Sequence, residues 1–170
     1  IVGKSGVGQA IAHQRGALHS VGLLLDERMS GNTQIVHINT VLPDSPLMAV
    51  LARARGKKVI YYAHSTMEDF CCSFRGSNLL APLFKRWIQF CYRRGDVILT
   101  PTAYSEEILQ NYRLKRPIYH ISNGIDTEFF RPSVQRRAAF REKYGLREDE
   151  KVVISVGHLM ERKGILDYIE

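Results

Sequence analysis

The sequence predicts an α/β fold, a Rossmann-like, doubly wound parallel sheet with helices on both faces. The main observation is that short β-branched, apolar runs alternate with segments in which apolar residues follow helical spacing. A second is that glycine and proline separate these segments. A third is the composition: 45% of the 170 residues are hydrophobic and 24% are charged, as in ordinary soluble domains. No run of about 18 apolar residues occurs, so we expect no transmembrane helix.

The strands and helices of this sheet follow one another along the first 122 residues. Gly22 and Gly56 lie where two of the helices should end, and Pro101 follows the third strand. Strands are expected at 35–39, 58–63, 97–100 and 118–122, and helices at 7–21, 46–55, 81–94 and 103–112.

The last third of the chain predicts the start of a second domain. Asn123-Gly124 is a turn signal, and a highly charged helix is expected at 133–144, closed by Gly145. A polar hinge at 147–151 then precedes a strand at 152–156, a glycine turn and a new helix. We therefore assign residues 1–146 to an N-terminal domain and residues 147–170 to the beginning of another Rossmann-like domain.

The loop at 4–8 (KSGVG) opens the first helix, and in a doubly wound sheet such a loop follows a buried strand. Only three residues precede it, so we expect the chain to lack its first strand and to be cut at both ends. Gly6 and Gly8 would let an anion approach the backbone amides of this loop, with Ser5 contacting substrate. A dinucleotide fingerprint would need glycine where Ile11 stands, and a purely structural turn is the alternative.

His64 follows the second strand in the segment YYAHST. Ligands of α/β proteins bind at the carboxyl ends of parallel strands, where a histidine can orient a hydroxyl or stabilise developing charge. Ser65 and Thr66, the next two residues, are expected to contact substrate. A lone histidine can equally be structural.

Basic and aromatic residues interleave along the helix at 81–94, and the net charge of the chain is +7. This pattern fits either a core-facing stripe with solvated flanks or a helix that rests on an anionic lipid surface. No nucleic-acid-binding signature accompanies the charge, so we expect no nucleic-acid partner. The predicted membrane-contact residues are Lys85, Arg86, Trp87, Arg93 and Arg94.

Arg162 and Lys163 lie between a predicted strand and a predicted helix, where two cations and helix amides suit a diphosphate. Solvated surface is the alternative for such a pair. The three cysteines contain no C-x-x-C and the histidines show no metal-ligand spacing. We therefore expect reduced thiols and no metal site.

The segments SNGIDTEF (122–129), VVISVG (152–157) and ERKG (161–164) resemble the two-domain GT-B glycosyltransferases of family 4. Within this family, the sequence most resembles the glycolipid synthases of low-GC Gram-positive bacteria. The segments that carry this resemblance are KSGVGQAI, VHINT, AHSTMEDF, SFRGSNLLAPLFK and TPTAYSEEIL. These stretches cover most of the chain from residue 4 onward. The resemblance implies an acceptor-binding N-terminal domain and a donor-binding C-terminal domain.

Several residues acquire roles from this resemblance. His64 matches the catalytic-site histidine that positions the transferred sugar, and Lys163 matches the lysine that holds the nucleotide diphosphate. Gly6 and Gly8 match the glycine loop near the donor phosphates and the acceptor. The family usually has arginine at the position of His158, and Arg162 could supply that charge.

The resemblance implies a retaining hexosyltransferase that moves glucose or galactose from a UDP-sugar to a glycolipid of the monoglucosyl-diacylglycerol type, without a metal or other cofactor. The protein would lie peripherally on the cytoplasmic face of the membrane. In the family, the paired glutamates (E-x7-E) lie far downstream in the donor domain, in a part that this sequence does not include, so this fragment is expected to be inactive. Two alternatives remain: a family-4 transferase of capsule or cell-wall polysaccharide synthesis, and a non-catalytic anion-binding α/β module.

Overall fold

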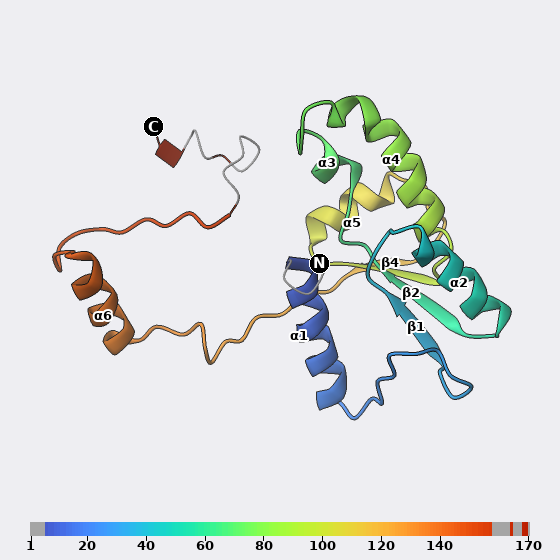
Figure 1. Ribbon diagram of the computed structural model, residues 1–170, viewed down its shortest axis with the longest axis horizontal. Helices are drawn as coiled ribbons and strands as arrows, with labels where there is room; N and C mark the ends of the chain where they lie inside the picture. Colours follow the sequence, from blue (N-terminus) through green and yellow to red (C-terminus); the bar gives the residue numbers. More distant parts are fainter. Residues whose placement is uncertain (1–5, 158–163, 165–167, 170) are drawn as a thin grey trace. The chain divides into compact units, whose positions relative to one another are not determined.

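The computed structural model describes residues 6–157, 164 and 168–169. Its centre is a four-stranded parallel sheet in the order β1-β2-β3-β4 (Figure 1). The strands are β1 Ile35–Ile38, β2 Lys58–Tyr62, β3 Val97–Thr100 and β4 Ile118–His120. The predicted fold class is confirmed, and each strand begins where the sequence indicated, although β4 is two residues shorter.

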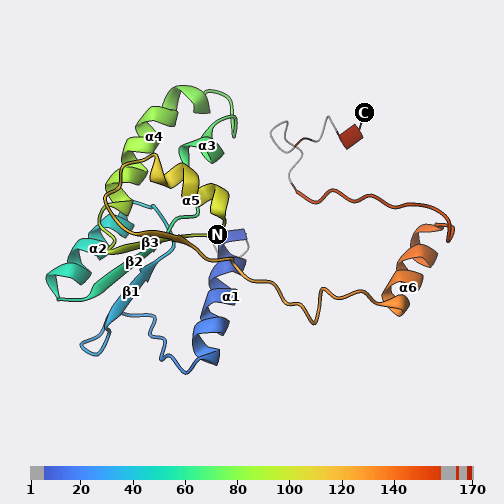
Figure 2. The same cartoon turned by 180° about the vertical axis from the view of Figure 1, so that it is seen from behind.

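Helices alternate with the strands as expected. They are α1 Gly6–Ser20, α2 Asp44–Ala54, α3 Met67–Phe70, α4 Ser77–Tyr92 and α5 Ala103–Gln110. Helix α2 packs on β1 and β2, and α5 packs on β3 and β4. Figures 1 and 2 show α1 and α2 on opposite sides of the strands, so both faces carry a helix.

The core lies where α4 and α5 cover the middle strands. Its largest members are the rings of Tyr61, Tyr92 and Tyr112, with Ile88 and Ile98 packed beside them, all at most 1% exposed. The burial of such rings is a major source of stability, about 25 cal/mol for each Å² of apolar surface removed from water. The hydroxyls of Tyr92 and Tyr112 also form hydrogen bonds with the segment after β2.

Two helical details differ from the prediction. Helix α4 begins at Ser77 rather than at residue 81, after Gly76 in a left-handed conformation, and it keeps Pro82 within its second turn. Helix α3 was not predicted. It forms because the Thr66 hydroxyl accepts a hydrogen bond from the backbone amide of Asp69, which caps the first turn.

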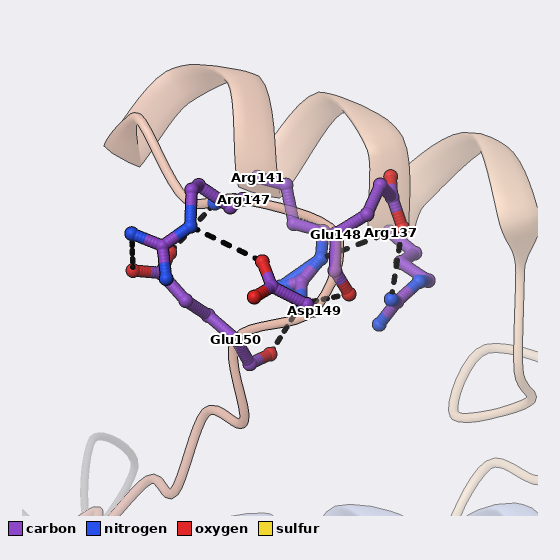
Figure 3. A network of polar contacts seen from close by, with 6 residues as sticks. All are labelled: Arg137, Arg141, Arg147, Glu148, Asp149 and Glu150. Carbon is purple, nitrogen blue, oxygen red and sulfur yellow. Dashed lines mark hydrogen bonds and ion pairs between the residues drawn. The ribbon is translucent and has the colours of Figure 1, made fainter.

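The chain divides into two compact units between Gly124 and Ile125. The second unit contains α6 Val134–Tyr144, capped by Ser133 at its start and by Gly145, at φ +63°, at its end. A polar network links this helix to the following turn (Figure 3). In it, the 5%-exposed Arg141 donates to the main-chain oxygens of Glu148 and Glu150.

The predicted strand at 152–156 is wrong for this structure, which has no strand there among its described residues. Val153 is 74% exposed and Val156 is 91% exposed. A strand needs a neighbouring strand to satisfy its amides and carbonyls, and the second unit has none among its described residues. The helix expected after residue 164 and the domain boundary at 146 stay predictions.

Candidate functional site

The carboxyl ends of the four strands bring polar side chains to one edge of the sheet. Asn39 follows β1, His64 follows β2 after one intervening residue, and Thr100 and His120 end β3 and β4. The parallel register pairs Ile38 with Tyr61 and Thr100 with His120, so these ends lie beside one another. This edge is where open α/β sheets bind ligands.

His64 lies half-buried at this edge. Its Nε2 is 3.2 Å from Oδ1 of Asn39, and its ring stacks on Tyr62 with 4.6 Å between centroids. Burial, and in second place the nearby His37, lowers the pKa of His64 to about 4. The imidazole is therefore neutral near pH 7 and presents one N–H donor and one acceptor nitrogen.

The loop that carries His64 is anchored to the core at several points. The Tyr92 hydroxyl donates to the carbonyl of Ser65 at 2.8 Å, and the buried Thr100 hydroxyl donates to the carbonyl of Ala63 at 3.3 Å. Burial raises the pKa of Tyr92, which keeps its hydroxyl protonated as a donor. The loop around His64 is thus bonded to two side chains, Tyr92 and Thr100, that are fully buried.

Ser65 and Thr66 contribute to the shape of this loop. Ser65 is half-buried and its carbonyl accepts from Tyr92. Thr66 is only 3% exposed, and its hydroxyl accepts from the amide of Asp69 and donates to the carboxylate of Asp69 at 3.0 Å. A role for either side chain in binding substrate stays a prediction.

The glycine loop is described only in part. Helix α1 begins at Gly6, and a Cβ added there would meet no atom within 4 Å. Gly8 is half-buried in the first turn, and Ser5 lies outside the described residues, as do His158, Arg162 and Lys163. The predicted phosphate contacts therefore stay predictions. Further along α1, Nδ1 of His13 lies 3.2 Å from the carbonyl of Gly124.

Several of the basic and aromatic residues on α4 make contacts within the fold. Trp87 donates its indole N–H to the carbonyl of Val41 at 2.7 Å, and the Lys85 ammonium lies 4.5 Å from the ring centroid of Tyr112. Arg94 packs over the ring of Phe90 at 3.4 Å. The outward surface of this helix includes Arg86 and four exposed large apolar side chains, namely Leu79, Leu80, Leu83 and Phe90.

Two groups at the strand ends were not singled out from the sequence. Asn39 bonds to His64, and its position directly after an apolar strand is the same signal that identified His64. His120 forms a close pair with Glu106, with 2.5 Å between Nδ1 and Oε2. Within the described residues, no group of three or more His, Cys, Asp or Glu side chains could hold a metal ion.

Comparison with known proteins gives consistent matches. The model of Glycosyltransferase Family 4 matches residues 11–129. The chain is 37% identical over 169 residues, 98% of its length, to a processive diacylglycerol alpha-glucosyltransferase of Acholeplasma laidlawii. It is 23% identical over 86% of its length to an alpha-galactosylglucosyldiacylglycerol synthase of Streptococcus pneumoniae.

The chain spans 49% and 40% of the lengths of these two relatives, so about half of each. Among solved structures, a glycerate dehydrogenase related protein of Thermoplasma acidophilum aligns with 96% of this chain and 70% of its own. Its identity of 13% and TM-score of 0.19 are too low to indicate a shared fold. Among the described residues, no helix has both the length and the apolar character needed to cross a bilayer.

Proposed function

Because the chain belongs to glycosyltransferase family 4, we propose that the protein is a retaining hexosyltransferase that glycosylates a diacylglycerol lipid. The observation that carries this proposal is the 37% identity, over nearly the whole chain, to a protein named as a diacylglycerol alpha-glucosyltransferase. We propose UDP-glucose as the donor. Galactose is the second candidate, supported by the weaker similarity to an alpha-galactosylglucosyldiacylglycerol synthase.

The geometry at the carboxyl edge is compatible with this chemistry. A neutral His64, held by Asn39 and Tyr62, can hydrogen-bond a hydroxyl of the transferred sugar or of the acceptor. Gly6 and Gly8 would let the donor phosphates approach the start of α1. Arg162 and Lys163 would stabilise the diphosphate as it leaves, so the reaction would need no metal ion.

The outer face of α4 is the proposed membrane contact, with the protein resting on the cytoplasmic leaflet. Leu79 and Leu83 are 85% and 66% exposed, Arg86 lies one turn after Leu83, and Arg93 and Arg94 follow at the C-terminal end of the helix. Each basic side chain near an anionic surface contributes about 1 kcal/mol of attraction. Such a face would bring the carboxyl edge of the sheet close to a lipid acceptor.

Two other functions fit less well. A transferase of capsule or cell-wall synthesis would act on a different acceptor, and both curated relatives are named for diacylglycerol lipids. A non-catalytic anion-binding module is disfavoured by the family match over 11–129.

The experiment is a donor and acceptor screen with the complete protein. UDP-glucose and UDP-galactose are each offered with diacylglycerol, monoglucosyl-diacylglycerol and a polyprenyl phosphate, and products are identified by mass spectrometry. We expect a hexose on a diacylglycerol lipid with retained anomeric configuration. Transfer only to the polyprenyl acceptor, or no transfer to any lipid, would overturn the proposal.

A further inference from the structure

The side chain of Asn39 contacts His64, and no requirement of the fold explains this contact. Asn39 stands one residue beyond β1, and His64 stands two residues beyond β2, on neighbouring parallel strands. Their side chains meet at 3.2 Å between Oδ1 and Nε2. Among the described residues, the hydrogen bond recorded for the His64 ring is this one, made by Nε2. The other ring nitrogen, Nδ1, does not belong to the buried polar atoms without a partner.

We propose that Asn39 is a positioning residue that holds His64 as its Nε2–H tautomer, so that Nδ1 is presented to the substrate as a hydrogen-bond acceptor. A neutral imidazole has one donor and one acceptor nitrogen, and the bond made by one nitrogen decides what the other can do. When Nε2–H donates to the amide oxygen of Asn39, Nδ1 can only accept.

The surroundings of His64 favour a single ring orientation. Tyr62 stacks beneath the ring with an interplanar angle of 23°, and its hydroxyl donates to the carbonyl of Ile121. The ring centroid of Tyr62 also lies 5.9 Å from that of His37. With the ring plane fixed by stacking and one nitrogen fixed by Asn39, the remaining nitrogen points in one direction. A substrate hydroxyl placed there would donate its hydrogen to Nδ1.

The catalytic part of this inference rests on the proposed function. The tautomer of His64 can be measured without any assay of activity. It is measured by long-range proton–nitrogen correlation spectra of the histidine rings, which distinguish the two neutral tautomers. The His64 signals are assigned by their loss in His64→Gln. We expect Nε2–H in the wild-type protein, a mixture or Nδ1–H in Asn39→Leu, and Nε2–H again in Asn39→Asp.

Asn39→Asp is the decisive variant because a carboxylate can only accept a hydrogen bond. It should preserve the tautomer and most of the transferase rate at alkaline pH, whereas Asn39→Leu should lose the rate about tenfold. Asn111→Leu is the matched control, since Asn111 is exposed at the end of α5 and bonds to Glu107. It should change neither readout.

An Nδ1–H tautomer in the wild type, or an unchanged Nε2–H in Asn39→Leu, would overturn the inference. If Asn39→Leu fails to fold, the wild-type spectrum and that of Asn39→Asp still decide it, because loss of Nε2–H in Asn39→Asp contradicts an accepting role. If the tautomers behave as expected but no lipid is glycosylated, the proposed function fails while the positioning role stands.

Discussion

The burial of neutral His64 makes a quantitative prediction about stability and pH. Its pKa is about 4 in the folded chain, against 6.5 for an ordinary histidine. In the unfolded chain the ring takes up a proton below pH 6.5, while in the folded chain it stays neutral down to about pH 4. Stability that is fully present above pH 6.5 is therefore lost as the pH falls through this window.

The size of the effect follows from the difference between the two pKa values. Each unit corresponds to about 1.4 kcal/mol, so the full loss by pH 4 is about 3 kcal/mol, of which about 2 kcal/mol is lost between pH 7 and pH 5. His64→Gln removes the titrating group but keeps a side-chain N–H that can reach Asn39. This variant should lose about 2 kcal/mol less than the wild type between these pH values.

The assay is urea unfolding at pH 7 and pH 5, followed by the fluorescence of Trp87, the single tryptophan, which lies in the first unit. Burial also lowers the pKa of His37. Because His37 is present in both proteins, its contribution to the pH dependence cancels in the comparison. Equal losses of stability in wild type and His64→Gln would refute the claim that His64 is buried as the neutral ring.

Three further predictions concern other parts of the structure. Tyr92→Phe leaves the half-buried carbonyl of Ser65 without its donor, so it should lower the free energy of unfolding by about 1 kcal/mol in urea titrations; an unchanged value would show that the hydrogen bond does not anchor the loop. Arg141→Met removes the donors to the turn after α6, so backbone amides at 146–150 should exchange with solvent at least tenfold faster, and unchanged protection would contradict this role. Leu83→Asp should reduce co-sedimentation with anionic vesicles several-fold, while the control Leu24→Asp, in the loop after α1, should not, although Leu24 is the more exposed of the two at 101% against 66%; equal binding by both variants would exclude this membrane face.

The sheet could be predicted because its strands are short, apolar and separated by strong turn residues. Val97–Thr100 is the clearest case, since Pro101 ends it and the predicted bounds are those observed. The segment at 152–156 has the same apolar character but forms no strand, because hydrogen-bonding partners, and not side chains alone, make a strand. A local pattern cannot reveal whether such a partner lies beside it.

The site was predictable only at the level of the strand ends. His64 was placed at the carboxyl edge because it follows an apolar run, but its contact with Asn39 depends on strand order and register, which the sequence does not specify. The sequence also did not show which face of α4 would be turned toward the core. The indole of Trp87 donates to the carbonyl of Val41 while Leu79 and Leu83 are exposed, an arrangement that depends on packing between elements.

The central question is whether His64 serves the transfer of a sugar to a lipid. The deciding measurement is the rate at which the complete protein transfers labelled glucose from UDP-glucose to monoglucosyl-diacylglycerol, in the wild type and in His64→Gln. We expect glycolipid product from the wild type and a rate at least about 100-fold lower in the variant. An undiminished rate in His64→Gln would contradict the catalytic placement of His64, and the absence of lipid product from the wild type would contradict the proposed function.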